Sequence, residues 1–297
     1  MRAAAIFGPE FSPKTLQAFQ TDNRIEWQIG LPSVSDQGDI ILLFGGDGTV
    51  HCHLSELVKL LLPVLVIPTG SGNDFARALG LLHIGDALVA WRRFLIGRAN
   101  IRNIDLGVIT ALCDHPGDAT PPSGKDSHYF CSVAGIGLDG EVARRANRLP
   151  RWLRGRGGYA LAALSAIFPF EPLPITISRI ESDGKWTTLG ERPTTLAAFG
   201  NTAIYGGGMK IAPLARMDDG KLDVCVIDAI RPWKLACAFP TVYFGRHLRL
   251  REVDYFKTAR LRVECVTPLD VFADGEYVCR TPVEIGVEPG TLKVLMP

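Results

Sequence analysis

The sequence predicts a two-part chain, in which an α/β domain with a parallel sheet is followed by a β-rich domain. Two short apolar segments of strand length, DIILLF (39–44) and PVLVIP (63–68), enclose VHCHLSELVKLLL (50–62), which has helical spacing. A strand, a glycine turn, a helix and a second strand form a βαβ unit with parallel strands. From about residue 103, short strand-like segments that are linked by turns indicate the second domain.

The first domain begins with MRAAAIFGPE, which predicts a strand and a turn because Gly8–Pro9 interrupts the segment too early for a signal peptide. The spacing within 50–62 indicates a helix whose buried face is formed by Val50, Leu54, Leu57, Val58 and Leu61. NDFARALGLL and GDALVAWRRFL continue the helical pattern to about residue 98.

The second domain is expected to contain strands at NIDLGVIT, HYFCSVAGI, LPITISRIE, TTLAAFGN, KLDVCVID, ARLRVECV, LDVFADGEYV and LKVLMP. CDHPGDATPPSGKDS (113–127) is rich in Pro, Gly, Asp and Ser, which predicts a hairpin loop between two of these strands. The longest uncharged stretch, GGYALAALSAIFPF (157–170), predicts a short helix. No apolar run reaches the roughly 18 residues that a membrane span requires.

Composition narrows the class of protein. The 297 residues carry a formal net charge of +1, with 47% hydrophobic and 21% charged residues, which is typical of a soluble chain with two domains. The near-neutral charge excludes a dedicated nucleic-acid binder, which carries a strong basic excess. Seven cysteines include no CxxC pair, so neither a disulfide framework nor a zinc knuckle is expected. Reduced thiols predict a cytoplasmic protein.

Two glycine-rich loops each follow a predicted strand and precede a helix. In GGDGTV (45–50) the N–H groups at the start of the helix would bind an anion, or Asp47 would cap a tight turn. In PTGSGNDFARALG (68–80), Ser71, Gly72 and Asn73 would donate to phosphate, or Asp74 would cap the helix. Both loops lie at the carboxyl edge of the predicted sheet, where open α/β sheets bind ligands.

A third motif, VFADGEYV (271–278), has two interpretations. Asp-Gly strongly favours a hairpin turn. Alternatively, Asp274 and Glu276 lie on one face of an extended segment, where they would act as a pair of functional carboxylates. Other nucleotide motifs are missing from the sequence, namely the GxxxxGK[ST] loop, the GxGxxG spacing in either glycine loop, and the protein kinase set.

The motifs GGDGTVH, PTGSGNDFARALG, GIGLDGEVA, YGGGMKIAPLARMDDGKLDV and the late DGE occur in the order and spacing of the diacylglycerol kinase catalytic family. The chain resembles this family, which includes the sphingosine kinases and soluble bacterial lipid kinases, over essentially its whole length. The resemblance implies an N-terminal α/β domain like that of NAD kinases and phosphofructokinases, a C-terminal β-sandwich, and nucleotide in the cleft between them. It divides the chain into 1–102, with a return of the chain at about 289–297, and 103–288.

The resemblance also implies roles for the residues. Gly45, Gly46, Asp47, Gly48, Thr49, Val50 and His51, with Gly70, Ser71, Gly72 and Asn73, would line the ATP phosphates, with Thr49 and Asn73 as side-chain donors. Asp47, Asp74 and Asp139 would hold the catalytic Mg²⁺, partly through water, in agreement with the preference of Mg²⁺ for few direct carboxylates. Asp274 would be the general base with Glu276 beside it, although the sphingosine kinase branch assigns that role to the position of Asp47.

A second metal site is implied at APLARMDDGKLDV (212–224), where the Asp219 side chain and the carbonyls of Arg216 and Lys221 would bind a structural Mg²⁺. The alternative is an Asp-Asp-Gly turn without an ion, and Asp218 is a neighbour that could substitute. Two positions depart from the common family pattern, because His51-Cys52 replaces Asn-Glu and Ala273 replaces a bulkier residue.

The resemblance therefore predicts an ATP- and Mg²⁺-dependent lipid kinase that converts diacylglycerol to phosphatidic acid. Another lipid substrate (a monoacylglycerol, a sphingoid base, ceramide or phosphatidylglycerol), an NAD kinase, and a silent lipid- or nucleotide-binding module are the alternatives. NAD kinases lack the late DGE and the GGGMKIAP segment. The segment 143–170 contains six arginines, Trp152 and no acid, which indicates peripheral contact with an anionic membrane or else a surface arginine cluster beside a core helix. The sequence leaves a homodimer open.

Overall fold

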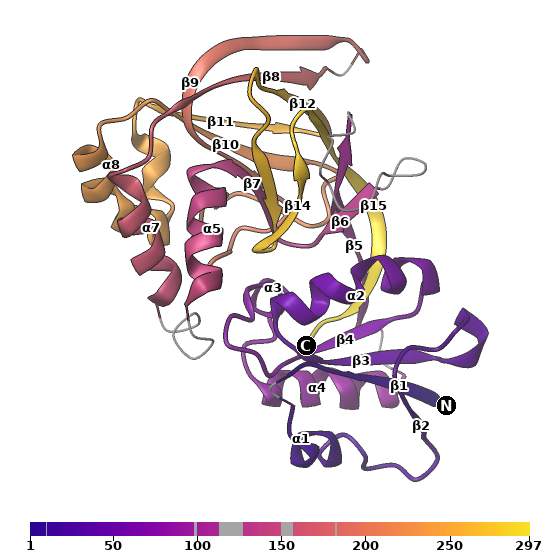
Figure 1. Cartoon of the computed structure of the whole chain (residues 1–297). Helices are drawn as coiled ribbons and strands as arrows, with labels where there is room; N and C mark the ends of the chain where they lie inside the picture. Colours follow the sequence, from indigo (N-terminus) through magenta and orange to yellow (C-terminus); the bar gives the residue numbers. More distant parts are fainter. Residues whose placement is uncertain (10, 98–99, 113–126, 150–156, 182) are drawn as a thin grey trace. The chain divides into compact units, whose positions relative to one another are not determined.

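The computed structural model describes residues 1–9, 11–97, 100–112, 127–149, 157–181 and 183–297 (Figure 1). It divides into two compact units, the first formed by residues 1–105 and 289–297 and the second by residues 106–288. The sequence placed these boundaries at 102/103 and 288/289. The predicted loop at 113–127 and the arginines at 151, 154 and 156 lie largely or wholly outside the described residues.

The first unit is an α/β domain built on a parallel sheet, as predicted. Its strands are ordered β2-β1-β3-β4, and the end of β15 adds a further parallel partner through Val294 and Val64. These strands are β1 (Arg2–Phe7), β2 (Glu26–Ile29), β3 (Ile40–Gly45), β4 (Val64–Pro68) and β15 (Val283–Leu295). Every residue of β3 and β4 is buried, which explains why both strands are continuous apolar runs.

Helices cover both faces of this sheet, with α2 on one face and α1 and α4 on the other (Figure 1). They are α1 (Pro13–Gln17), α2 (Asp47–Leu60), α3 (Asp74–Ala78) and α4 (Ile84–Leu95), with a short 3-10 turn at η1 (Ser35–Gln37). The buried face of α2 is Val50, Leu54, Leu57 and Leu60, so the prediction for Leu61 was wrong. Leu61 ends the helix in a left-handed conformation, with φ 54°, and this turns its side chain into solvent.

The second unit is a β-sandwich whose strands pair antiparallel, as predicted. Its strands are β5 (Ile101–Ala111), β6 (Ser127–Phe130), β7 (Val133–Gly137), β8 (Leu173–Ile180), β9 (Trp186–Gly200), β10 (Leu222–Asp228), β11 (Val253–Thr258), β12 (Arg260–Glu264), β13 (Asp270–Ala273), β14 (Glu276–Arg280) and the first part of β15. Strand β9 pairs with β7, β8 and β10, and β13 pairs with β7 and β14. The sequence analysis missed β11, which lacks a continuous apolar run.

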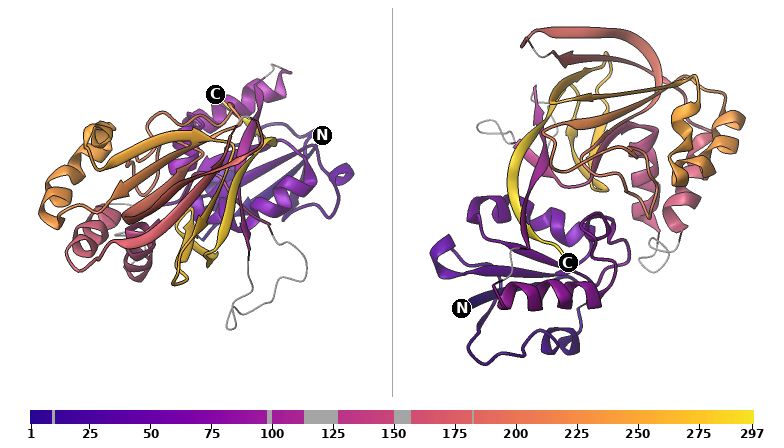
Figure 2. Two further views of the ribbon diagram at one scale, coloured as in Figure 1. Left: turned by 90° about the horizontal axis from the view of Figure 1, so that it is seen from above. Right: turned by 180° about the vertical axis from the view of Figure 1, so that it is seen from behind.

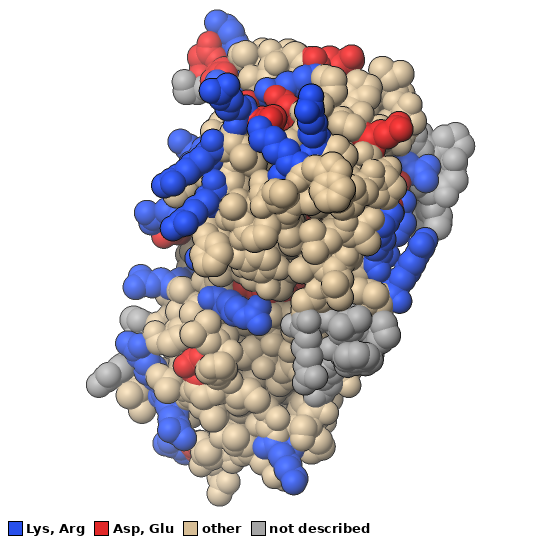
Figure 3. All heavy atoms as spheres, turned by 90° about the vertical axis from the view of Figure 1, so that its left-hand side faces the viewer, with Lys and Arg blue, Asp and Glu red and all other residues tan. Residues whose placement is uncertain are grey.

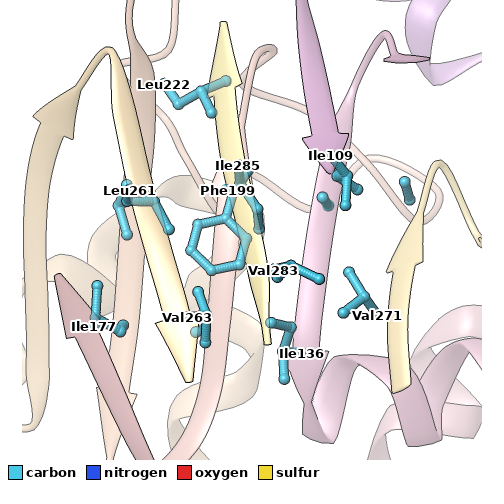
Figure 4. Close-up of a cluster of buried hydrophobic side chains, with 14 of the residues drawn as sticks. Ile109, Ile136, Ile177, Phe199, Leu222, Leu261, Val263, Val271, Val283 and Ile285 are labelled. Atoms are coloured by element: carbon cyan, nitrogen blue, oxygen red, sulfur yellow. The ribbon is translucent and has the colours of Figure 1, made fainter. Parts of the chain in front are cut away.

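The strands of this unit carry two hydrophobic cores, one on each face. Alternate residues of β10 belong to different cores: Leu222, Val224 and Val226 to one, and Cys225 and Ile227 to the other. The first core is formed almost entirely by strands and includes Phe199, Ile136 and Val283 (Figure 4). The second core is completed by helices, so the central strands are buried on both faces.

Those helices are α5 (Leu138–Arg148), α7 (Tyr159–Ile167) and α8 (Pro232–Ala238), followed by the short turns η3 (Phe239–Phe244) and η4 (Arg246–Arg249). They lie together on one side of the strands in all three views (Figures 1 and 2). The helix predicted within 157–170 is α7, whereas α5 and α8 were not predicted. Within the described residues, no helix has both the length and the hydropathy to cross a membrane.

Candidate phosphate-binding loops and catalytic carboxylates

The two glycine loops of the first unit leave the same edge of the sheet and touch each other. Strands β3 and β4 are in parallel register, with Gly45 paired to Pro68, so both chains turn away at the same level. A Cβ atom on Gly70 would lie 2.5 Å from the Cα of Gly46, closer than any side chain permits. Glycine is therefore required where the loops cross, and the cost of its flexibility is offset by this close approach.

The Asp47 carboxylate fastens one loop to the other. Its Oδ2 accepts the N–H of Asp74 at 3.0 Å, and its Oδ1 accepts the N–H of Phe75 at 2.9 Å. These donors are the first amides of α3, which have no acceptor within their own helix. Asp47 thus caps the helix of the neighbouring loop. A carboxylate in a glycine loop thus has a structural partner 27 residues away.

Two further residues complete the second loop. Asp74 is 3% exposed and forms an ion pair with Arg77 at 2.6 Å, so it does not cap α3 as the sequence suggested. Asn73 has a left-handed backbone with φ 56°, and its side chain accepts the N–H of Gly70 at 3.1 Å and donates to the carbonyl of the same residue. Asn73 therefore fixes the shape of the loop, and its donation to phosphate stays a prediction.

The remaining predicted phosphate ligands lie at helix starts or in the loop. Residues 47–51 form the first turns of the 14-residue helix α2, and residues 70–73 precede α3. Gly48 and Ser71 are exposed. The sequence analysis missed Thr69, whose Oγ1 is buried without a hydrogen-bond partner at the end of β4. Helix N-termini with such an orphaned hydroxyl nearby suit a phosphate, which accepts several hydrogen bonds.

In the second unit, Asp274 lies in the two-residue turn between β13 and β14. Asp274 and Gly275 have φ values of 52° and 87°, so the motif forms the hairpin turn and the extended-segment interpretation was wrong. The Asp274 carboxylate accepts the N–H groups of Cys131 at 2.9 Å and Ser132 at 2.8 Å, and more weakly that of Val133. Glu276 is exposed at the start of β14 and does not share this position.

Asp139 follows strand β7, whose first residue donates to Asp274, but Asp139 is more buried than Asp274. It lies in the first turn of α5 and is only 8% exposed, so it is not a solvated surface acid. Its side chain packs against Gly135, and the Tyr205 hydroxyl donates to its Oδ1 at 2.7 Å. Burial raises the pKa of Asp139 to about 6, and the bond from Tyr205 lowers it only partly.

Three groups that the sequence analysis missed surround these two carboxylates. Tyr205 precedes the run Gly206–Gly208, all with positive φ, and the motif YGGGM was the available signal. Tyr159 lies close to Gly206 and Gly275, since a Cβ on Gly275 would approach its hydroxyl to 2.8 Å. Asn147 donates to the Gly275 carbonyl at 2.9 Å and so anchors the turn that carries Asp274 to helix α5.

Carboxylate oxygens are the donors that Mg²⁺ prefers, and the buried Asp139 suits a cation. Within the described residues this carboxylate has no ion pair, so a bound cation would favour its charged form. No cluster of three or more His, Cys, Asp or Glu side chains of metal-binding geometry occurs in the described part of the chain. Mg²⁺ does not require one, because it takes one or two carboxylates and completes its shell with water and substrate phosphates.

The second predicted metal site does not fit an ion. The Asp219 Oδ2 pairs with the Lys257 ammonium at 2.8 Å, and its Oδ1 accepts the N–H of Lys221 at 3.2 Å. The same ammonium lies 3.2 Å from the fully buried Asp223. A lysine therefore supplies the positive charge that the loop was expected to take from Mg²⁺, and a divalent ion beside it would be repelled. This partner could not be predicted from the local motif, because Lys257 lies 38 residues from Asp219, on β11.

Together, these features define a class of protein with paired glycine loops on an α/β sheet and buried carboxylates on a β-sandwich. Residues 12–109 match the diacylglycerol kinase catalytic domain, and residues 132–296 match the YegS C-terminal NAD kinase beta sandwich-like domain. The chain belongs to the diacylglycerol kinase family of lipid kinases.

Relatives and solved structures agree with this assignment. A diacylglycerol kinase of Mycobacterium tuberculosis is 36% identical over 265 residues, which cover 89% of this chain and 79% of the relative. A diacylglycerol kinase of Bacillus subtilis is 28% identical over 87% of this chain and 78% of its own length. The crystal structure of a diacylglycerol kinase from Bacillus anthracis superposes with a TM-score of 0.65 at 19% identity, covering 100% of this chain and 96% of that one, which shows a shared fold.

The raised pKa of Asp139 predicts that this carboxylate lowers the stability of the folded protein at neutral pH. Between pH 3.8 and about 6, the unfolded chain releases this proton while the folded chain retains it, so wild-type stability falls as the pH rises. Asp139→Asn removes this cost. We expect the variant to be more stable than wild type by up to about 3 kcal/mol above pH 6, with no difference near pH 3. Denaturant unfolding across pH measures this, and exposed Asp36→Asn is the control; equal pH dependence of both variants would contradict the prediction.

Asp274→Asn tests the hydrogen bonds around the turn. Asparagine tolerates the positive φ but has one acceptor oxygen, so its NH₂ group would face an amide N–H of Cys131 or Ser132. We expect the free energy of unfolding to fall by about 1–3 kcal/mol. Exposed Glu276→Gln, two residues away, should change it by less than about 0.5 kcal/mol. Equal stability of Asp274→Asn and wild type would show that these hydrogen bonds contribute nothing.

Lys257→Met tests whether the Lys257 ammonium takes the place of a metal ion beside Asp219 and Asp223. Removing the ammonium leaves the buried Asp223 and its neighbour Asp219 without their positive partner. We expect a loss of about 2–3 kcal/mol, below the value for a fully buried pair because Lys257 is partly exposed. Excess Mg²⁺ should raise the melting temperature of this variant but not that of Lys221→Met in the same loop. If EDTA destabilises the wild type and Lys221→Met alike, a metal is present after all.

Proposed function

We propose that this protein transfers the γ-phosphate of ATP to the hydroxyl of a membrane lipid, and that diacylglycerol is the substrate and phosphatidic acid the product. The main observation in support of this proposal is the pair of glycine loops that Asp47 joins at the carboxyl ends of β3 and β4. Two relatives that cover most of the chain are diacylglycerol kinases, which supports the choice of lipid. NAD is disfavoured as acceptor because these relatives act on lipid.

In this proposal, the first unit binds the nucleotide phosphates. The first N–H groups of α2 and the exposed Gly48 and Ser71 are positioned to donate to phosphate oxygens. The crossing of Gly46 and Gly70 keeps side chains away, so the phosphates can approach the backbone. Thr69 would supply its unpartnered hydroxyl. Holding the phosphates in one position is the main requirement of phosphoryl transfer, since little covalent chemistry is left to the protein.

Asp47, Asp74 and Asp139 would hold Mg²⁺, directly or through water. When bound, this ion neutralises charge on the phosphates. Each carboxylate is oriented by another protein group: Asp47 by the start of α3, Asp74 by Arg77, and Asp139 by Tyr205. Oriented carboxylates lose little freedom when a ligand arrives, which favours binding.

The lipid hydroxyl must lose its proton as it attacks. We assign this step to Asp274, whose carboxylate is held in place by the backbone of residues 131–133, because the family resemblance gives this position the role of general base. Asp47 is the alternative base. Asp47 lies between the two glycine loops, where the resemblance assigns it to the metal, and it is expected to act there instead. Exposed Glu276 is expected to be dispensable.

A kinase of a two-tailed lipid has to work at a bilayer surface. We therefore propose peripheral contact with an anionic membrane from the cytoplasmic side. The high density of arginine and the absence of acid in residues 143–170 support this contact.

The test is phosphate transfer from radiolabelled ATP to a panel of acceptors in mixed micelles, with the products separated by chromatography. The panel contains diacylglycerol, monoacylglycerol, sphingosine, ceramide, phosphatidylglycerol and NAD. We expect diacylglycerol to be labelled, labelling to stop on chelation of Mg²⁺, and Asp274→Asn to lower kcat/KM by about 10²–10⁴-fold. Glu276→Gln is the matched control. Labelling of NAD alone would overturn the proposal, and nucleotide binding without any transfer would indicate a silent module.

A further inference from the structure

We propose that an apolar face formed by α7 and α8 inserts into the interface of anionic bilayers and docks the protein there. This inference rests on the proposed function and specifies the surface that reaches the lipid. We define the α7–α8 patch as Leu161, Leu164, Phe168 and Trp233. All four side chains are large and exposed, and Trp233 is 73% exposed.

Helix α7 has small residues on the face that packs into the core and large apolar residues on its exposed face. The residues that pack into the core are mostly small, namely Ala162, Ala163, Ala166 and Ile167. The large residues at 161, 164 and 168 follow helical spacing on the outer face, and the helix contains no charged residue. Packing against the core does not require large apolar groups outside. Apart from Ser165, the exposed face of α7 is therefore apolar, and such a face is expected to be covered by a partner.

The second part of the patch comes from a distant segment. The rings of Phe168 and Trp233 meet edge to face at 4.9 Å, so α7 and α8 present one continuous apolar surface. Phe244, at the end of η3 beyond α8, is also 73% exposed. Exposed aromatic residues that adjoin one another are rare on a surface that faces water only, and they mark interaction sites.

The charges that border the patch select an anionic bilayer as its partner. Residues 231–251, which contain α8, η3 and η4, include four arginines, one lysine and no acid. Arg231, Arg246 and Arg249 are exposed, and within the described residues they form no ion pair. Lys234 is neutralised by Glu252 at 2.6 Å. Figure 3 shows this side of the second unit as an uncharged surface with Lys and Arg along its borders and few acids.

This combination matches the chemistry of a membrane interface. Tryptophan and phenylalanine lie favourably at headgroup level, and arginines beside them meet lipid phosphates. A second protein copy would need an acidic complement to these arginines. The segment 231–251, which is basic and free of acid, forms part of this patch and would repel the same face of another copy. The observations therefore favour a bilayer over a dimer.

The first experiment measures partitioning of the whole protein onto sucrose-loaded vesicles made of equal parts phosphatidylglycerol and phosphatidylcholine. Phe168→Glu combined with Trp233→Glu should weaken partitioning by at least about tenfold. Val266→Glu is the matched control, because Val266 is 85% exposed in the loop between β12 and β13. Arg246→Glu combined with Arg249→Glu should weaken binding by about fivefold or more per charge, and only where phosphatidylglycerol is present.

A second readout places Trp233 in the bilayer. Vesicles with brominated acyl chains should quench part of the tryptophan fluorescence of the wild type, and Trp233→Phe should lose this quenching. Trp186→Phe, a change in β9, should retain it. Thermal unfolding confirms that each variant is folded, and the surface position of Trp233 makes this the expected result.

The outcomes separate this inference from the kinase proposal. Patch variants should retain transfer to a short-chain diacylglycerol dissolved as monomers and lose transfer to diacylglycerol in vesicles. If the wild type binds vesicles but phosphorylates no lipid, the kinase proposal is wrong and the membrane-docking role of the patch remains supported. Unchanged partitioning of the patch variant, an equal loss with Val266→Glu, or a wild-type dimer that Trp233→Glu dissociates would overturn the docking role.

Discussion

The hydrogen bonds from the start of α3 to the Asp47 carboxylate are the interaction on which the arrangement of the two glycine loops depends. They join two loops that are 27 residues apart, and they do so where Gly46 and Gly70 cross without room for a side chain. The position of one helix start is thereby tied to that of the other. Phosphate binding by helix N-termini requires donors that are already oriented, because ordering them upon binding would cost conformational entropy. The capping aspartate provides that order in advance.

Three aspartates illustrate how position decides the chemistry of one side chain. Asp47 is bound by helix amides, Asp274 by the backbone of residues 131–133, and Asp139 by the hydroxyl of Tyr205. Only Asp139 is buried with a pKa raised to about 6. It is therefore unfavourable as an anion until a cation arrives. Asp47 and Asp274 each accept backbone hydrogen bonds, whereas Asp139 accepts a side-chain hydroxyl and its burial disfavours the charged form.

Much of the fold followed from the sequence, because β3 and β4 are continuous apolar runs on either side of the helical spacing of α2, and the family motifs indicated the order of the elements. Individual residues were predicted less well. Leu61 fits the helical spacing, yet the helix ends one residue earlier in a left-handed turn. The acceptor role of Asp47 toward α3 and the ion pair of Lys257 with Asp219 depend on contacts between distant segments. Periodicity reports which face of an element is apolar, and it carries no information on which distant group meets a given carboxylate.

The same limit applied to the α7–α8 patch, whose two halves are separated by more than 60 residues of β-sandwich. Within the second unit, α7 also connects this patch to the turn that carries Asp274, the proposed base. Tyr159, at the first position of the helix, lies against Gly275 beside Asp274, and Phe168 follows its last turn. A helix of nine residues is about 14 Å long, which is shorter than an extended lipid tail. In the proposed function, a lipid in the bilayer that the α7–α8 patch contacts would therefore lie within about one tail length of Asp274. Docking and proton transfer would then be coupled through one short helix.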